Sequence, residues 1–356
     1  MAIGVAINGL GTVGRQLLKA LCARKADNGV DDRFSIKLVN DMTTPENMEY
    51  LLEHDTIYGP WDDVAIGSDG KGNTELWIGN QRIRYTSIPN AANLPLGELS
   101  IDVVFECSGF YNRKDKAYDF IAAGAKHVVI MGLAGNDLPT VVYDINHKSV
   151  LNSDQVISIP GGTAIANAVV GYAINNSAGY NISLANFLEI GSNIGAEYLD
   201  TPVSSASAPN YQTGRSGAWN LIRSTSGAAK AIGLIIPEIN GKCVSTNTRT
   251  ATIQGAMSIG VCLVWNFDLD AFNRAFKTMA SDNKEGTIVY EEMGNAIVSS
   301  DVVGSSGVWY CANATYQQIP NEGSYLVTIP VIYDSTMVQI SNAVASVVYF
   351  RDNGIW

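Results

Sequence analysis

The stretch Ile3-Gly-Val-Ala-Ile-Asn-Gly-Leu-Gly-Thr-Val-Gly-Arg15 decides the fold. Its first part, Ile3 to Asn8, is rich in residues that favour β-strands. The chain then passes through a G-x-G-x-x-G pattern into apolar residues from Val13 to Leu21, which recur at the helical spacing of three and four. A strand, this glycine pattern and a helix, in that order, predict a dinucleotide-binding domain of Rossmann type.

Each glycine of this loop has its own role in the predicted site. Gly9 permits a tight turn, Gly11 lets the backbone approach a pyrophosphate, and Gly14 lets the helix pack closely on the strand. The phosphates would lie on the free N–H groups at the helix N-terminus. The alternative is a Rossmann domain that keeps the loop for packing alone. The loop residues that we expect beside the cofactor are Asn8, Gly9, Gly11, Thr12, Val13 and Gly14.

A carboxylate for the adenosine ribose follows at the expected distance. A second strand-like run, 36–39, ends just before Asp41, which comes 27 residues after Gly14. An acid about 20 residues beyond the glycines accepts hydrogen bonds from the ribose hydroxyls in such domains. Because its charge would repel a 2′-phosphate, Asp41 favours NAD over NADP. Further strand-like runs at 102–106 and 127–131, with a helix-like segment at 114–123 between them, predict a parallel sheet.

Composition excludes several classes of protein. The chain has 356 residues, which suggests two domains, and only 16% of them are charged, against about 25% on average. That balance of residues argues against disorder. The net charge of −11 and the absence of a Lys/Arg run argue against nucleic acid as a partner, because a polyanion would be repelled.

Five scattered cysteines without a C-x-x-C pair suggest a reducing compartment, with no disulfide framework and no metal site. The first residues lack the basic stretch of a signal peptide. The longest nearly apolar segment, 164–174, is far shorter than the ~20 residues of a membrane-spanning helix. We therefore predict a soluble, cytoplasmic protein with no membrane partner.

Further motifs occur in a fixed order along nearly the whole chain. They are Asn40-Asp41, 45–48, 50–52, 58–61, 105–110, 116–117, 123–126, Asn146-His147, Gly214-Arg215, 224–231, 236–242, 298–301 and Tyr333-Asp334. Together with the glycine loop, they resemble phosphorylating glyceraldehyde-3-phosphate dehydrogenase. The resemblance implies an α/β protein with a Rossmann domain at 1–157, completed by a C-terminal helix at 341–356. It also implies an α+β catalytic domain at 158–340 and assembly as a homotetramer.

The resemblance fails at the catalytic positions. The family carries its nucleophile in the motif Ser-Asn-Ala-Ser-Cys-Thr-Thr-Asn-Cys, and the aligned run here is 158–166, with Gly162 in place of the nucleophilic cysteine. Hydride transfer from an aldehyde first needs a covalent thiol adduct, which glycine cannot form. No cysteine occurs between Cys107 and Cys243. The family's histidine base aligns with Gly191, and all three histidines lie in the N-terminal half.

The resemblance also assigns cofactor and phosphate positions. Cys107, Ser108 and Gly109 align with the turn beside the nicotinamide, and Ser335 replaces the asparagine that holds the carboxamide. A buried, inert thiol is the simpler interpretation of Cys107. For Arg215 and Arg249, the alternative to phosphate binding is a structural ion pair at a subunit interface. The residues that match the family's phosphate sites are Thr163, Arg215, Ser226, Gly227 and Arg249.

Three functions remain open from the sequence. The first is a catalytically inactive homologue, or pseudoenzyme, that binds NAD or serves as a structural or regulatory subunit, with itself or with an active paralogue. The second is an NAD-dependent oxidoreductase acting on a phosphorylated alcohol or ketone, which needs no thiol adduct. The third is a purely structural subunit of a larger assembly. The loss of nucleophile, base and carboxamide anchor together favours the first.

Overall fold

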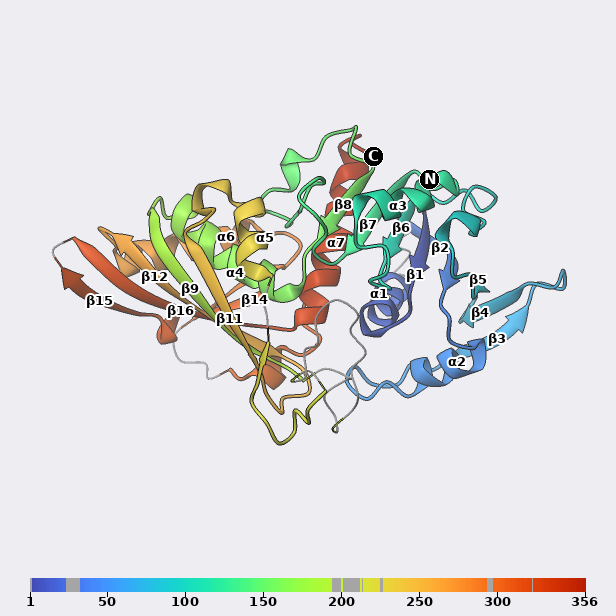
Figure 1. Ribbon diagram of the computed structural model, residues 1–356, viewed down its shortest axis with the longest axis horizontal. Coiled ribbons are helices and arrows are strands. Elements are labelled where there is room, and N and C mark those ends of the chain that lie inside the picture. The colour runs from blue at the N-terminus through green and yellow to red at the C-terminus, as the bar shows by residue number, and fades with distance from the viewer. Residues whose placement is uncertain are drawn as a thin grey trace. The chain divides into compact units, whose positions relative to one another are not determined.

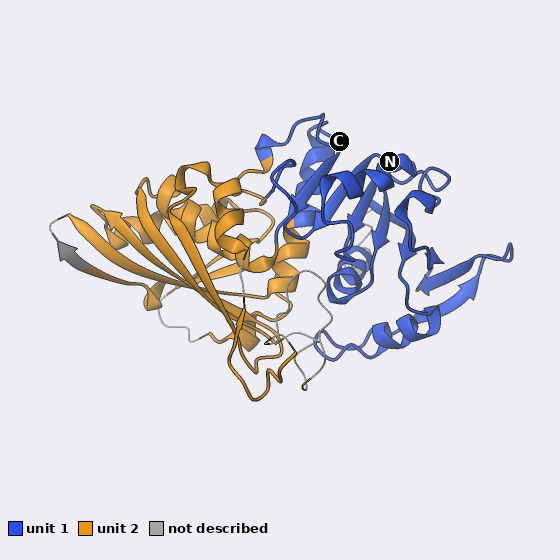
Figure 2. Ribbon diagram, viewed as in Figure 1, with its two compact units in different colours: residues 1–141, 148–160, 343–356 blue, residues 142–147, 161–342 orange. Residues whose placement is uncertain are grey.

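The structure is a computed structural model that describes residues 2–23, 33–193, 200, 212, 214–224, 227–292, 297–321 and 323–356 (Figure 1). The chain forms two compact units (Figure 2). Unit 1 contains residues 1–141, 148–160 and 343–356, and unit 2 contains residues 142–147 and 161–342. Each unit is built around one large sheet.

Unit 1 contains an eight-stranded sheet with the order β3-β4-β5-β2-β1-β6-β7-β8. The strands from β5 to β8 pair in parallel, whereas β3 and β4 are antiparallel. This sheet is the parallel arrangement that the sequence predicts, with an antiparallel extension at one edge. The strands are β1 Ile3–Asn8, β2 Phe34–Asn40, β3 Val64–Ser68, β4 Thr74–Ile78, β5 Gln81–Thr86, β6 Val103–Glu106, β7 His127–Met131 and β8 Val156–Ile159.

The helices of unit 1 follow the strands in the order that a parallel sheet requires. Helix α1, Thr12–Ala23, begins directly after the glycine loop, and its side chains Leu17, Leu18 and Leu21 are buried. Helix α2, Pro45–Glu53, is capped by Thr44, whose hydroxyl accepts the N–H of residue 47. Helix α3 is Lys114–Ala122, and short 3-10 turns lie at Ala91–Asn93 and His147–Ser149.

The last helix, α7, spans Ser335–Asp352 and ends within unit 1. It begins six residues earlier than the predicted start at 341, because Asp334 caps its first turn. The Oδ1 atom of Asp334 accepts the backbone N–H groups of Thr336 and Met337 at 2.9 and 3.0 Å. An aspartate at this position satisfies N–H groups that have no partner within the helix.

Unit 2 contains an eight-stranded sheet in which β10-β11-β9-β12-β16-β14-β13 are neighbours and β15 also pairs with β16. Most pairs are antiparallel, and β9–β11 and β13–β14 are parallel. The strands are β9 Ile182–Gly191, β10 Ile222–Ser224, β11 Cys243–Arg249, β12 Ala256–Trp265, β13 Ile288–Glu291, β14 Val308–Cys311, β15 Tyr316–Asn321 and β16 Ser324–Tyr333.

Helices cover one face of this sheet. Helix α4, Gly162–Tyr172, continues into a π-helical turn at Ala173–Ser177 and contacts β9, β12 and β16. The other helices are α5 Ala228–Ile235 and α6 Leu269–Asp282, and short 3-10 turns lie at Pro237–Ile239, Ser299–Val302 and Ala312–Ala314. The side chains of β9 alternate, so that Phe187 is buried and Leu188 is exposed, as one-sided burial requires. In the described part of the chain, no helix has the length and apolar character needed to cross a bilayer.

Unit 1 contains a histidine whose protonation should limit stability in acid. The ring of His127 stacks on Trp356 at 4.4 Å, and burial, reinforced by the charge of Lys126, lowers the pKa of His127 from 6.5 to about 4. Between these values the unfolded chain binds a proton that the folded chain excludes, so stability rises with pH across that window and is lost as pH falls through it.

We therefore predict that His127→Phe, which keeps an aromatic ring on Trp356, makes stability less dependent on pH between 6.5 and about 4. Urea unfolding of both proteins at several pH values in that window measures the slope. An identical pH slope for the variant and the unaltered protein would contradict the assignment.

Candidate functional site

The glycine loop has the steric properties that pyrophosphate binding requires. A Cβ at Gly9, where φ is +90°, would lie 2.6 Å from the backbone nitrogen of Ser108, and one at Gly14 would lie 1.9 Å from the carbonyl oxygen of Gly9. A Cβ at Gly11 would meet no described atom within 4 Å. The first and third glycines therefore serve packing, whereas the second leaves open space where a pyrophosphate could approach.

Asp41 lies beside this loop, and two backbone N–H groups fix the orientation of its carboxylate. Its Oδ2 accepts the N–H of Leu10 at 2.6 Å, and its Oδ1 accepts the N–H of Thr43 at 2.8 Å. An ionised carboxylate has about four acceptor positions, so the side chain can still accept ribose hydroxyls. Thr12, the first residue of α1, is exposed, and Val13 is half-buried.

A polar network that the sequence analysis missed joins the carboxyl ends of three parallel strands. The Asn8 amide donates to the Glu106 carboxylate, and Asn40 Nδ2 donates to Asn8 Oδ1 at 2.7 Å. The Oε1 atom of Glu106 accepts the N–H groups of Ser108 and Gly109, both at 2.9 Å. Burial raises the pKa of Glu106, and these donors act in the opposite direction. Asn8 and Ser108, predicted as cofactor ligands, thus also hold the loop together.

Cys107 is unsuited to act as a nucleophile. Burial and, secondarily, the charge of Glu106 raise the pKa of its thiol well above 9.0. A thiol rather than a thiolate is therefore present at neutral pH. Gly109 turns the chain with φ of +75°. The predicted cofactor residues from Asn8 to Gly14, together with Asp41 and the turn at 107–109, thus gather at the carboxyl ends of β1, β2 and β6.

In unit 2, the position aligned with the family nucleophile has no room for a side chain. Gly162 is the first residue of α4, after the N-cap Gly161. A Cβ at Gly162 would lie 2.4 Å from the carbonyl oxygen of Ser335 and 2.6 Å from its Cα atom. These contacts are with backbone atoms at the start of α7, which cannot turn aside as a flexible side chain can. The Ser335 backbone therefore occupies the space that a cysteine would need.

The position aligned with the family base is open in comparison. Gly191 is the last residue of β9, and the nearest described atoms to a Cβ there belong to the Asn247 amide, at 3.7 and 3.9 Å. Arg249 of β11 pairs with Gly191 in the parallel ladder. None of the three histidines of the chain lies on β9, and the Nδ1 atom of His147 accepts the N–H of Asp144 at 3.0 Å.

The three cysteines of unit 2 are not activated. Burial raises the pKa of Cys243 and Cys311 to about 11, and it raises the pKa of Cys262 as well. A reactive cysteine has the opposite shift, since positive charge or a helix N-terminus lowers its pKa.

The residues matched to phosphate sites lie in different surroundings. Thr163, the second residue of α4, accepts the Tyr333 hydroxyl at 3.1 Å. Arg215 donates to Asp200 at 3.0 Å in an exposed ion pair, and this bond lowers the pKa of Asp200. The pair lies within one chain, whereas the alternative for Arg215 was an ion pair at a subunit interface, which stays a prediction. Gly227 precedes α5, and Ser226 lies outside the described residues.

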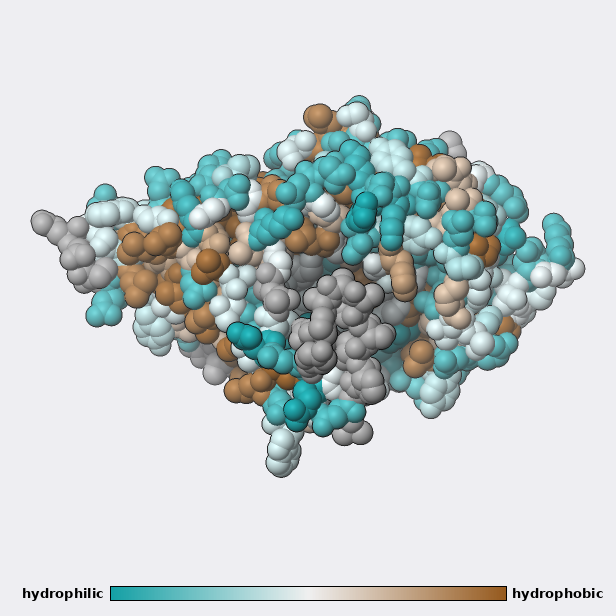
Figure 3. Space-filling view, viewed as in Figure 1, coloured by the Kyte–Doolittle hydropathy of each residue, from teal (hydrophilic) through white to brown (hydrophobic). Residues whose placement is uncertain are grey.

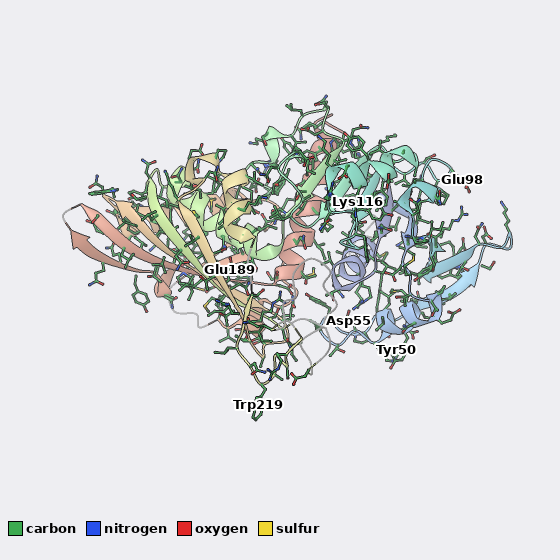
Figure 4. All side chains as sticks on the ribbon, viewed as in Figure 1. Tyr50, Asp55, Glu98, Lys116, Glu189 and Trp219 are labelled. Atoms are coloured by element: carbon green, nitrogen blue, oxygen red, sulfur yellow. The ribbon has the colours of Figure 1, made fainter. Side chains whose placement is uncertain are left out.

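A second buried network lies behind the aligned catalytic positions and was also missed from the sequence. Glu189 of β9, labelled in Figure 4, is 2% exposed. Its carboxylate accepts Asn167 Nδ2 at 2.9 Å and Asn247 Nδ2 at 3.1 Å, and the Ser258 hydroxyl donates to Asn167. The network ties α4 to β9, β11 and β12. The signal in the sequence is a glutamate between Leu188 and Ile190 in a strand-like run.

Comparison with known proteins agrees with this architecture. The model of the glyceraldehyde 3-phosphate dehydrogenase NAD binding domain matches residues 3–114, and that of the C-terminal domain matches residues 194–335. The chain belongs to the glyceraldehyde-3-phosphate dehydrogenase family. The stretch between the two matched ranges, 115–193, contains both Gly162 and Gly191.

Full-length relatives in this family are similar to the chain. The glyceraldehyde-3-phosphate dehydrogenase of Streptococcus pyogenes is 31% identical over 355 residues, which cover 98% of both chains. That of Clostridium pasteurianum is 30% identical over 348 residues, which cover 97% of this chain and 98% of the relative. That of Lactobacillus delbrueckii subsp. bulgaricus is 30% identical over 306 residues, 85% of this chain and 86% of the relative.

Alanine substitutions at two of the loop glycines, Gly14 and Gly11, should have different effects. Gly14→Ala should lower the free energy of unfolding by about 1–3 kcal/mol, because its Cβ collides with the Gly9 carbonyl oxygen. Gly11→Ala should leave stability nearly unchanged and weaken NAD binding by about tenfold or more, because its Cβ enters the pyrophosphate space. Urea unfolding and isothermal titration with NAD measure the two effects. Equal NAD affinity of Gly11→Ala and the unaltered protein would contradict the site.

Proposed function

We propose that this member of the glyceraldehyde-3-phosphate dehydrogenase family binds NAD through unit 1 and does not catalyse the oxidation of glyceraldehyde 3-phosphate. The observation that carries the proposal is the contact of Gly162 with the Ser335 backbone. The contact adds to the evidence from the missing sulfur atom, because backbone atoms occupy the space that any side chain at this position would need.

The chemistry of aldehyde oxidation makes that position indispensable. A thiolate sulfur must bond to the aldehyde carbon while a proton reaches its oxygen, and only the resulting adduct carries a hydride that can leave to NAD. Gly162 supplies no sulfur, and Gly191 supplies no base. The thiols of Cys107, Cys243 and Cys311 have raised pKa values and are unsuited to replace the nucleophile.

The residues of unit 1 fit the adenosine diphosphate half of NAD. The open space at Gly11 suits a pyrophosphate, and Asp41 retains acceptor capacity for ribose hydroxyls. Bound NAD would supply a hydride acceptor, and the chain's own residues would hold its phosphates and ribose. Ser335, in place of the family asparagine, has a shorter side chain and no carboxamide to hold the nicotinamide.

The direct test combines turnover with binding. Purified protein given glyceraldehyde 3-phosphate, NAD and phosphate should form no reduced nicotinamide above a blank without protein, while isothermal titration shows saturable NAD binding. Steady formation of reduced NAD, or a burst equal to the protein concentration, would refute catalytic inactivity. Absence of NAD binding would refute the cofactor assignment.

Substitutions that introduce the family's side chains should show that position 162 has no room for a side chain, whereas position 191 has. Gly162→Cys should lower the free energy of unfolding by about 1–3 kcal/mol and restore no activity, because the Ser335 backbone must move to admit it. Gly191→His should be tolerated better, because its Cβ would make only ordinary contacts with Asn247. Urea unfolding of both variants measures the difference. A stable, active Gly162→Cys protein would overturn the steric argument.

We also propose that the chain assembles with copies of itself through the sheet of unit 2, and that a tetramer is the resulting form. Apolar side chains on the sheet face opposite α4 are 37–61% exposed, and Figure 3 shows hydrophobic residues gathered over this part of the chain. Large exposed apolar patches mark interaction surfaces. The residues are Leu184, Leu188, Ile190, Val244 and Leu326.

A charge on this face should dissociate the assembly. Leu188→Asp should shift the molar mass measured by light scattering toward that of one chain, because the carboxylate would be buried without a partner. Leu151→Asp is the matched control, since Leu151 lies in unit 1 and is also exposed. A monomeric unaltered protein, or an unchanged mass for Leu188→Asp, would contradict the proposal.

A further inference from the structure

Unit 1 contains a cavity of about 400 Å³ at the edge of the sheet opposite the glycine loop. Ile3 at the start of β1, Val103 at the start of β6 and His127 at the start of β7 line it. These are the amino ends of parallel strands, whereas a dinucleotide binds at their carboxyl ends. The cavity is therefore separate from the proposed NAD site, although both belong to the same sheet.

One side of the cavity is apolar and held in place. The indole of Trp356 donates to the carbonyl oxygen of Asp154 at 3.0 Å, stacks on His127 and contacts Phe350 at 4.9 Å between ring centroids. Val347 of α7 is buried and adds an aliphatic surface. A rigid aromatic and aliphatic wall favours a flat, apolar ligand body, because little side-chain freedom is lost on binding.

The charged residues of the cavity are mostly cationic. Lys37, Lys126 and Arg351 line it, and Asp102 is the one acidic side chain among the lining residues. Because the pKa of His127 is lowered to about 4, its ring is neutral at pH 7. The lining thus carries more positive than negative charge in a protein whose net charge is −11. A positively charged region on a negatively charged protein raises the local concentration of anions.

At least one of these cations has bonding capacity left for a ligand. The Lys37 ammonium donates to the carbonyl oxygens of Leu99 and Ser100 at 2.9 and 3.1 Å. It has three N–H donors, so one remains without a partner among the described residues. Lys126 pairs with Asp102 at 2.7 Å, and its side chain is 70% exposed.

We propose that this cavity binds a small aromatic carboxylate, with its ring against Trp356 and Val347 and its carboxylate at Lys37. The volume lies within the ~300–1,000 Å³ range of small-molecule sites, toward its lower end. A carboxylate gains charge-assisted hydrogen bonds from the ammonium groups, whereas an aromatic cation of the same shape is repelled.

Isothermal titration with naphthoate tests the class of ligand. The same ring system as naphthylmethylammonium is the control for charge. Naphthoate should bind at one saturable site, and the ammonium compound should show no saturable binding. Failure of naphthoate to saturate, or equal binding of the two compounds, would overturn the proposal.

Three substitutions locate the binding. Lys37→Gln and Lys126→Gln should each weaken naphthoate binding by about tenfold. Lys71→Gln removes the same charge from the exposed turn between β3 and β4 and should leave binding unchanged. Lys126 is largely exposed, so its variant keeps the test valid if Lys37→Gln does not fold. Equal affinity in Lys126→Gln and the unaltered protein would refute the site. NAD titration of each variant keeps this outcome separate from the proposed NAD function.

Discussion

The contact of the Ser335 backbone with Gly162 is the constraint on which the functional site of unit 2 depends. It places the first turns of α4 and α7 closer together than any side chain at position 162 allows. Backbone atoms cannot rotate out of the way, and packed interiors transmit such strain to their surroundings. The same contact that joins the two helices therefore leaves no room for a side chain at position 162.

The aligned site residues of the two units differ in what surrounds them. In unit 1, close packing leaves no room for a side chain at Gly9 or Gly14. At Gly11, by contrast, no described atom occupies the space that a side chain would fill. In unit 2, the buried carboxylate of Glu189 accepts hydrogen bonds from Asn167 and Asn247, which stabilise this polar group in the interior.

The fold and the nucleotide loop could be predicted from the sequence because their signals are local. Strand, glycines, helix and Asp41 follow one another within a short stretch, and their spacing carries the geometry. The networks around Glu106 and Glu189 could not be found in this way, because their partners come from strands and helices that are distant in the chain. The ion pair of Arg215 with Asp200 was likewise not predicted, because the sequence suggested an ion pair of Arg215 only at a subunit interface.

By itself, the sequence determined the Rossmann-type loop, the negative net charge, and the lack of a cysteine or histidine at the aligned catalytic positions. Each of these follows from residue identity and short-range spacing. Only the tertiary structure decided that position 162 is closed while position 191 is open. The difference depends on which backbone lies against each glycine. That neighbour is set by the packing of segments far apart in the chain, which no local pattern encodes.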